Sequence, residues 1–173
     1  TIPLAPVSRL RRVLRVVLSH YVLNGIGVAL GLLVISAGVH LWLGAFAASA
    51  AAVGVIVSGP PDMPAPRRGK FLQMLPAPLL GTPLFFAVQY LHHNPLALGL
   101  LLVPATFFIF LLMAWGKRGA PVAIALMFAV VFSLAARSSY GGADSADANL
   151  AAALHSTLYF ALGALLYLPW SVL

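Results

Sequence analysis

The placement of charged residues divides this chain into apolar stretches of defined length. No charged side chain occurs from residue 16 to 61 or from residue 71 to 116, two stretches of 46 residues each. Each stretch matches two bilayer crossings, because a membrane-spanning helix needs roughly 20 apolar residues. Two shorter uncharged runs, 119–136 and 148–173, match one crossing each. The pattern predicts an all-α integral membrane protein with six transmembrane helices.

The basic residues predict which side of the membrane each connection faces. Nine of the ten fall before the first predicted span, between spans two and three, or between spans four and five. These nine are Arg9, Arg11, Arg12, Arg15, Arg67, Arg68, Lys70, Lys117 and Arg118. Lys and Arg concentrate in cytoplasmic loops. We therefore expect both the N-terminus and the C-terminus in the cytoplasm.

The same pattern predicts the domain boundaries. Residues 1–21 should form a basic amphipathic lead-in on the cytoplasmic face, and residues 22–173 the transmembrane domain. A tight external turn at 40–44 should join the first two spans. The predicted spans cover about 22–40, 42–59, 71–91, 95–115, 120–137 and 150–172. Since the last span ends at Leu173 without a basic flank, we expect the chain to be truncated before a cytoplasmic domain.

Composition excludes several classes of protein. With 62% hydrophobic and 8% charged residues, the chain cannot present an ordinary water-facing surface, so its solvent is lipid. The net charge of +7 does not indicate nucleic-acid binding, because the basic residues flank apolar runs. The absence of cysteine excludes thiolate metal sites. His92 and His93 lack a nearby carboxylate ligand and are expected at the membrane interface, so we expect neither a metal nor a cofactor.

The third predicted span is rich in proline. Pro76, Pro78 and Pro83 each remove a backbone donor, which frees a carbonyl one turn earlier and should break or strongly kink the helix. The residues that fall roughly on one face of a regular helix are Pro78, Thr82, Phe85 and Gln89. Broken helices often mark the substrate site of a transporter, and membrane helices also tolerate proline as a simple kink. Both interpretations stay open for this span.

A basic cluster precedes this span on the cytoplasmic side. Arg67, Arg68 and Lys70 follow a proline-rich link that contains Asp62. Topology alone explains basic residues here. They also lie at a helix start, where unpaired backbone N–H groups favour an anion. The cluster is therefore a candidate for concentrating an anionic substrate from the cytoplasm.

Polar residues on the first and last spans have two interpretations. Asn24 lies on a stripe with His20, Gly27, Gly31 and Gly38, a spacing that favours a close helix contact. Asn24 and His20 could instead line a polar pathway. His155 and Tyr159 lie near the external mouth of the last span, where packing and a functional role are both open.

Arg137 departs from the topological pattern, since it lies on the external side. It could pair with Asp144 or Asp147, or point into a vestibule as an anion contact. All three acidic residues of the chain lie in predicted loops. No carboxylate is therefore available within the predicted spans for a proton relay, which favours a facilitated pathway or coupling supplied by another part of the protein. Coupling through Asp62 at the membrane edge, or through a histidine, stays open.

The six spans, the Arg-rich start, the proline-rich third span and the link from Ser58 to Lys70 together resemble one family. The sequence is similar to the membrane unit of the fusaric acid resistance (FUSC), or aromatic acid exporter, superfamily, and more distantly to the plant aluminium-activated malate channels. The Asp-x-Pro element with following basic residues is represented here by Asp62, Pro64, Arg67 and Arg68. The resemblance implies a bacterial inner-membrane, multi-pass protein that exports small organic anions, aromatic carboxylates for example, and works as a homodimer.

Three functional hypotheses follow. The first is a permease or exporter unit for organic anions, whose path includes the break in the third span. The second is a membrane assembly or scaffold module with no transport of its own. The third, a membrane-embedded enzyme, is disfavoured, because the sequence has no paired carboxylates, His-Glu metal motif or evident nucleophile with a base. The expected partners are the lipid bilayer, an organic anion and a second copy of the chain.

Overall fold

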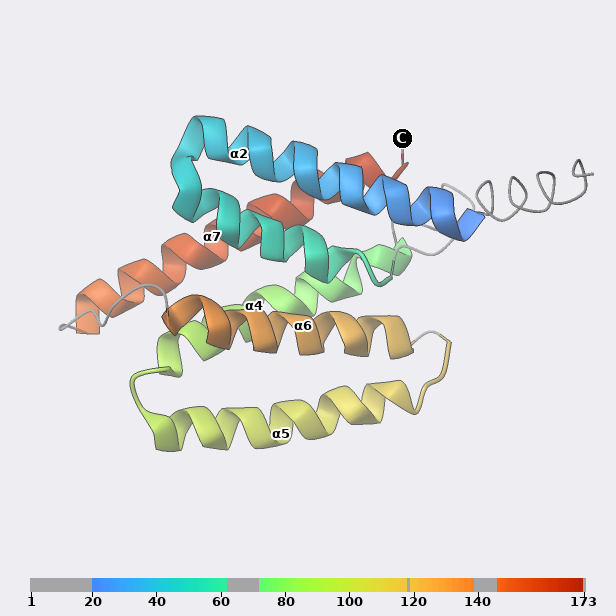
Figure 1. Cartoon of the computed structure of the whole chain (residues 1–173). Coiled ribbons are helices and arrows are strands. Elements are labelled where there is room, and N and C mark those ends of the chain that lie inside the picture. The colour runs from blue at the N-terminus through green and yellow to red at the C-terminus, as the bar shows by residue number, and fades with distance from the viewer. Residues whose placement is uncertain (1–19, 62–71, 118, 139–145, 173) are drawn as a thin grey trace, which may run out of the picture.

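The described part of the chain is almost entirely helical. The computed structural model describes residues 20–61, 72–117, 119–138 and 146–172, and no β-strand occurs within these ranges. The helices are α2 (His20–Ser58), α4 (Pro76–Leu91), α5 (Pro95–Met113), α6 (Gly119–Ser138) and α7 (Ala146–Val172) (Figure 1). The predicted all-α fold class is confirmed.

Helix α2 consists of two arms that meet at Gly44. The backbone of Gly44 has φ 87° and ψ 177°, which is non-helical and belongs to a region that only glycine adopts readily. The first arm (20–43) and the second arm (45–58) fold back on each other at this point (Figure 1). Gly44 lies within the predicted turn at 40–44.

Five helical segments are long and apolar enough to cross a membrane. They are Asn24–Ser58, Leu72–Leu91, Pro95–Met113, Gly119–Ala136 and Ala148–Ser171. This finding supports a multi-pass membrane protein. Both arms of α2 belong to the first segment, so six separate crossings and the cytoplasmic placement of the two ends remain predictions.

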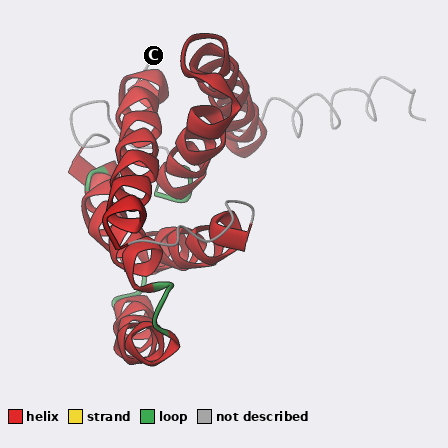
Figure 2. Cartoon of the chain, turned by 90° about the vertical axis from the view of Figure 1, so that its left-hand side faces the viewer, coloured by secondary structure: helices red, strands yellow, loops and turns green. Residues whose placement is uncertain are grey.

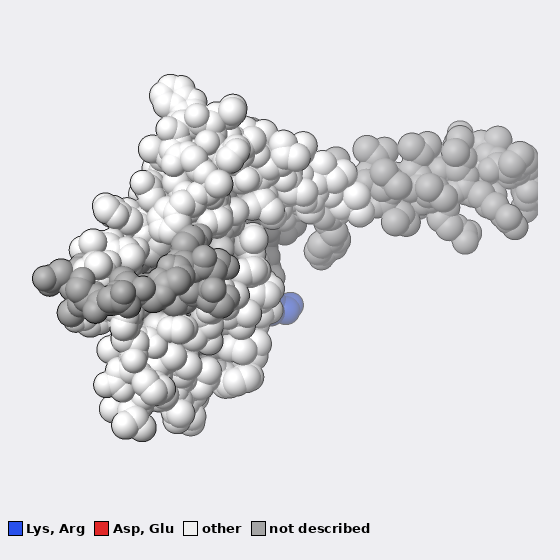
Figure 3. Space-filling view, turned by 60° about the vertical axis from the view of Figure 1, so that its left-hand side comes forward, with Lys and Arg blue, Asp and Glu red and all other residues white. Residues whose placement is uncertain are grey.

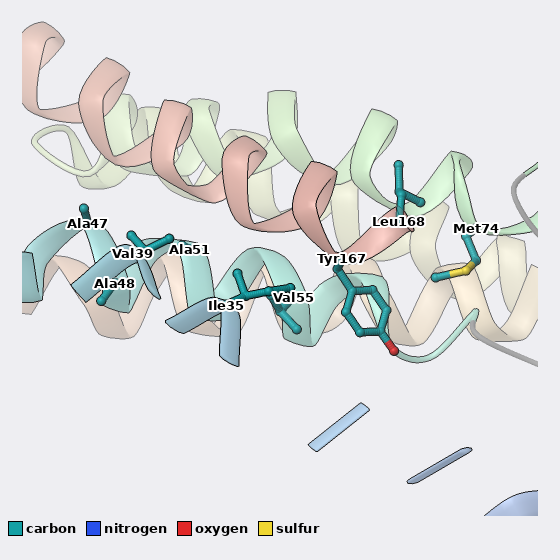
Figure 4. Close-up of a cluster of buried hydrophobic side chains, with 9 residues drawn as sticks. All are labelled: Ile35, Val39, Ala47, Ala48, Ala51, Val55, Met74, Tyr167 and Leu168. Atoms are coloured by element: carbon teal, nitrogen blue, oxygen red, sulfur yellow. The ribbon is translucent and has the colours of Figure 1, made fainter. Parts of the chain in front are cut away.

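The helices pack in a stack with α5 at one edge (Figures 1 and 2). The α2 arms pack mainly on α7, α4 and α6 lie in the middle of the stack, and α5 contacts α6 and α4. One buried cluster joins both α2 arms to α7 and Met74 (Figure 4). A second joins the second arm to α4, α6 and α7, and a third joins α5 to α6. The bundle therefore has three connected small cores.

The second arm of α2 and α7 approach each other closely. A Cβ atom built on Gly54 would overlap the backbone of Phe160, and one built on Gly163 would overlap the backbone of Ala51. Small residues permit such backbone contact, which is how membrane helices associate tightly. The second arm and α7 thus pack with their backbones in contact, and each helix contributes one glycine to this contact.

The predicted glycine stripe on the first arm is only partly a contact face. A Cβ atom on Gly27 or Gly38 would meet nothing within 4 Å, whereas one on Gly31 would collide with Trp170. Trp170 Nε1 also donates a hydrogen bond to the carbonyl oxygen of Gly27 at 2.9 Å. An indole, and not a close helix backbone, therefore contacts the stripe at Gly27 and Gly31. Trp170 thus has a packing role.

The prolines of the third predicted span interrupt the helix only locally. Residues 72–74 are helical and Leu75 is a turn residue, after which α4 begins at Pro76. Leu75 keeps right-handed helical dihedrals, φ −55° and ψ −40°. Thr82 Oγ1 donates to the carbonyl oxygen of Pro78 at 2.7 Å, one turn earlier on the same helix. Pro83 lies inside α4 and leaves the carbonyl oxygen of Leu79 without its helical donor.

The outer surface of the described bundle is apolar. Helix α5 buries only Ile109 fully, and Leu96, Leu100 and Phe107 are 85%, 79% and 63% exposed. The described residues visible in Figure 3 are correspondingly almost all uncharged. Such a surface is stable in contact with lipid and not with water.

Candidate functional site

A cavity of about 270 Å³ opens between four helical segments near one end of the bundle. The second arm of α2, α4, α6 and α7 each contribute to its wall. Its lining residues are Ser49, Ala50, Val53, Phe85, Gln89, Phe132, Ala135, Ala136 and Ser156. Gln89 lies two residues before the end of α4, and Ala136 two residues before the end of α6. The charge pattern of the sequence predicts that this end faces outward.

Gln89 is the most buried polar group in the cavity wall. Its side chain is 2% exposed, and its Nε2 donates a long hydrogen bond of 3.4 Å to the carbonyl oxygen of Ser133. Among the described residues, nothing donates to its Oε1. A buried carboxamide with unused hydrogen-bonding capacity costs free energy. The cavity therefore contains a polar group that a bound ligand can satisfy.

Two further buried hydrogen bonds fix the position of Gln89. Ser133 Oγ donates to the carbonyl oxygen of Phe85 at 3.2 Å, one turn before Gln89, so α4 and α6 are joined twice. Asn149 Nδ2 donates to the carbonyl oxygen of Tyr90 at 3.2 Å, which ties the start of α7 to the end of α4. These bonds hold the three helices around the cavity in one arrangement.

The remaining wall is mostly aromatic and apolar. Phe85 stacks on Phe160 of α7, with ring centroids 4.6 Å apart and planes inclined by 19°. Ser49 Oγ donates to the carbonyl oxygen of Phe46 at 2.8 Å, and Ser156 Oγ donates to that of Ala152 at 2.9 Å. Both hydroxyl groups thus direct their hydrogen toward their own helix. The Gln89 amide is the principal hydrogen-bond donor that the wall presents to the cavity.

No charged side chain lines the cavity among the residues that the structure describes. Arg137 directly follows the lining residue Ala136 and belongs to α6, but its side chain lies outside the description. The described residues also contain no group of three His, Cys, Asp or Glu side chains that could hold a metal.

A second cavity of about 390 Å³ lies between α4 and α7. Its walls are almost entirely apolar, and its lining residues are Leu75, Pro78, Leu79, Thr82, Pro83, Ala161, Leu165 and Leu168. The structure therefore separates Pro78 and Thr82 from Gln89, although a regular helix places them on one face. Phe85 lies between Thr82 and Gln89 in the sequence and stacks on Phe160 of α7. This aromatic pair separates the part of α4 that lines the second cavity from the part that lines the first.

The other predicted site residues are placed as follows. Asn24 is half-buried near the start of the first arm, far along the chain from the Gly44 bend, and does not line the cavity. His155 is exposed beside Ser156. Tyr159 is half-buried and makes an edge-to-face contact with Phe46 at 5.9 Å. The predicted cytoplasmic cluster lies outside the described residues: Asp62, Arg67, Arg68 and Lys70.

Sequence reasoning missed Ser133 and Ser49. Ser133 is the only residue with a polar side chain between Gly119 and Ala136, and it is fully buried. A lone hydroxyl in an otherwise apolar membrane helix is a signal that could have identified it. Ser49 lies in an alanine-rich stretch, where nothing in the sequence distinguishes it from a residue that faces lipid.

Comparison with known protein families shows which family the chain belongs to. The model of the family described as "FUSC-like inner membrane protein yccS" matches residues 78–173, more than half of the chain. The chain belongs to this FUSC-like family. The predicted resemblance to the FUSC superfamily is confirmed, while the similarity to plant malate channels stays a prediction. No curated protein and no solved structure matches the chain.

The matched region contains most of the cavity wall of this FUSC-like protein. It begins at Pro78 in α4 and includes Gln89, Ser133 and Ser156, while the second arm of α2 precedes it. The family description and the membrane-length helices together establish a multi-pass protein of the inner membrane. They also relate the chain to membrane transport at the level of the family.

Proposed function

We propose that this chain is the membrane unit of a permease that exports small organic anions, and that the cavity around Gln89 is part of the substrate path. The observation that carries the proposal is the buried, under-used carboxamide of Gln89 in an open cavity between four helical segments. Polar groups inside membrane helices are costly and are commonly functional. Membership of a transport-related membrane family supports the same conclusion.

The proposal includes six bilayer crossings, with each arm of α2 as one crossing. A straight helix of 35 residues would be roughly 50 Å long, far more than the roughly 30 Å of a hydrocarbon core. The fold at Gly44 removes this mismatch by returning the chain toward its starting side. Six crossings place the Gly44 bend and the cavity end of α4 on the same, external side, in agreement with the positive-inside pattern.

In this arrangement the cytoplasmic cluster attracts the substrate before it enters the bundle. Arg67, Arg68 and Lys70 precede the third span on the side from which an exported anion arrives. Positive residues raise the local concentration of an anion over about a Debye length. Arg137 follows Ala136, which lines the Gln89 cavity, and would help to release or capture an anion at the external end of the bundle.

Flux measurements test this function. Protein reconstituted in liposomes should move a radiolabelled aromatic carboxylate faster than protein-free liposomes do. Replacing Arg67 and Arg68 together by Gln should lower the rate at low ionic strength and have less effect at high salt, because screening already weakens the attraction. Unchanged flux in the double variant at low salt would contradict the role of the cluster, and no flux in the wild type would contradict the permease itself.

A scaffold role is the alternative, and the α2–α7 contact favours it. The paired close approaches at Gly54 and Gly163 form a rigid helix interface of the kind that assembly modules use. A scaffold predicts no substrate flux under any condition, together with loss of a protein partner when this interface is disrupted. The open cavity favours the permease over the scaffold, because a module that only assembles has no need for an internal space.

A further inference from the structure

The second cavity, between α4 and α7, has a buried floor and exposed rims. Pro78 and Leu168 are buried, whereas the lining residues Leu79 and Leu165 are 66% and 62% exposed. Exposed apolar side chains of a membrane-spanning bundle face lipid. The cavity therefore opens toward the hydrocarbon of the bilayer, and a molecule in the bilayer can enter it from the side.

The cavity extends along α4 over a distance that matches one leaflet of the bilayer. Its lining residues on this helix run from Leu75 to Pro83, which are about 12 Å apart at 1.5 Å per residue. Leu75 lies close to the start of the membrane-length segment Leu72–Leu91. The hydrocarbon of one leaflet is about 15 Å thick, half of the whole core. Beyond Pro83, the stacked rings of Phe85 and Phe160 close off the cavity. It therefore ends near the middle of the membrane, where the acyl chains of one leaflet also end.

The same end of α7 meets the start of α4. Ser171 Oγ donates a hydrogen bond to Met74 Sδ at 3.1 Å, and Met74 and Leu168 belong to one buried cluster. Leu168 therefore lies at the same end of the cavity as Leu75, and Ala161 lies toward its closed end. Both helices thus contribute a wall that runs from the membrane surface toward the middle of the bilayer.

The chemistry of the wall suits a hydrocarbon chain. Among the lining residues, the one side-chain donor is the hydroxyl of Thr82, which donates to the carbonyl oxygen of Pro78 at 2.7 Å. Pro83 frees the carbonyl oxygen of Leu79, which adds an acceptor and no donor. A phosphate group would lose its hydration here without gaining a donor, which is unfavourable. A hydrocarbon chain needs no hydrogen bond and can fill such a space by packing alone.

Charged residues near the open end favour an anionic headgroup. Arg67, Arg68 and Lys70 precede Leu75 by five to eight residues in the sequence, and the positive-inside pattern predicts them at the cytoplasmic surface. The same link contains one acidic residue, Asp62, so positive charge prevails. Basic residues at the cytoplasmic ends of membrane helices attract anionic lipid headgroups.

We propose that the second cavity binds one acyl chain of an anionic phospholipid from the cytoplasmic leaflet, and that the basic link selects its headgroup. The proposal rests on the topology of the proposed function, in which α4 starts at the cytoplasmic surface, but it does not require transport. A chain gains no hydrophobic free energy by leaving other lipid chains for a protein surface. Selectivity therefore comes from the shape of the cavity and from charge, and each is tested separately.

Native mass spectrometry of the protein released from detergent micelles measures which lipids the chain retains. The probes are phosphatidylglycerol, which is anionic, and phosphatidylcholine with the same acyl chains, which has no net charge. Glycerophosphoglycerol, the headgroup without its chains, is the competitor. Wild-type protein should retain phosphatidylglycerol about fivefold more than phosphatidylcholine, because the basic link attracts the anionic headgroup. The free headgroup should not displace it.

Two substitutions test the cavity. Ala161→Phe places a ring in it, and Leu79→Ala removes one exposed rim. Each should lower retention of phosphatidylglycerol about fivefold, because contacts with the chain are lost. The matched controls are Ala151→Phe and Leu80→Ala, at exposed positions outside the cavity, and they should retain the lipid normally. If Ala161→Phe folds poorly, Leu79→Ala decides the test, because its side chain is exposed.

A double substitution tests the headgroup. Replacing Arg67 and Arg68 by Gln should bring the retention of phosphatidylglycerol close to that of phosphatidylcholine, because the attraction to the anion is weakened. The control replaces Lys117 and Arg118 by Gln, a basic pair on another predicted cytoplasmic connection, and should keep the preference. An unchanged preference in the Arg67 and Arg68 variant would overturn the role of the basic link.

The lipid site is overturned if the wild type retains both lipids equally or if the free headgroup displaces phosphatidylglycerol. It is also overturned if Leu79→Ala retains the lipid normally, or if Leu80→Ala loses as much of it as Leu79→Ala does. The liposome flux assay separates this failure from failure of the proposed function. Flux without selective lipid retention would leave the permease intact and remove the lipid site, and selective retention without flux would do the reverse.

Discussion

At the scale of single residues, Gly163 is a position where a small change should have a large structural effect. A methyl group there overlaps the backbone of Ala51, which a membrane helix cannot avoid without moving. We expect Gly163→Ala to destabilise the protein by about 1–3 kcal/mol, the usual cost of overpacking. Gly99→Ala is the control, since Gly99 has no neighbour within 4 Å. Thermal unfolding in detergent should show a lower midpoint for Gly163→Ala only; equal midpoints would show that the helices do not approach this closely.

Trp170 gives a second test at this scale. Its indole N–H donates to the Gly27 carbonyl, a bond that joins α7 to the first arm of α2. Trp170→Phe should cost about 1 kcal/mol, because the carbonyl loses its donor. Trp115→Phe should change stability by less than about 0.5 kcal/mol, since Trp115 is 75% exposed. Chemical unfolding of the two variants compares them directly, and an equal effect would assign Trp170 to the membrane interface alone.

The roles of some single residues could be predicted from the sequence, and those of others could not. Gln89 could be selected because a carboxamide inside an apolar span is rare and costly. Its separation from Pro78 and Thr82 could not be predicted, since that depends on where Phe160 of α7 crosses α4. The close contacts of Gly54 and Gly163 could not be predicted for the same reason. Whether a glycine lies at a close helix contact depends on which helix packs against it, and the pattern of one helix does not show this.

At the scale of elements, the bend of α2 determines whether the first uncharged stretch crosses once or twice. Gly44 has a positive φ that side chains disfavour. We expect Gly44→Ala to destabilise the protein by about 1–3 kcal/mol. Gly38→Ala, in the same helix and without neighbours within 4 Å, should be neutral or slightly stabilising because alanine favours helix. The helical circular dichroism signal followed against temperature measures both. A neutral Gly44→Ala would mean that the turn tolerates a helical backbone.

The elements themselves are the most predictable part of the molecule. The lengths of the uncharged runs are sufficient to place the helices, because bilayer thickness fixes helix length. The proline-rich third span is less predictable. Pro76, Pro78 and Pro83 suggest a deep break, yet α4 continues after a local interruption at Leu75, whose dihedral angles stay helical. Membrane helices tolerate proline as a local disturbance, and the pattern alone does not show how deep the break is.

At the scale of the whole molecule, the six-crossing topology can be mapped chemically. The chain contains no cysteine, so single cysteines introduced at Leu43, His93 and Lys117 report their own positions. In intact cells, a membrane-impermeant maleimide should label Leu43→Cys and His93→Cys from the outside. Lys117→Cys should react only after permeabilisation. Labelling of His93→Cys without Leu43→Cys would place the Gly44 bend on the wrong side or inside the bilayer.

The central claim is that the cavity around Gln89 lies on the path of the substrate. The most direct test is benzoate flux in proteoliposomes by Ala135→Phe, which fills the cavity, compared with Ala151→Phe, which adds the same side chain at an exposed position of α7 outside it. We predict that Ala135→Phe reduces flux to near the protein-free background while Ala151→Phe retains the wild-type rate, with similar unfolding midpoints for both. Equal, undiminished flux in the two variants would contradict the claim.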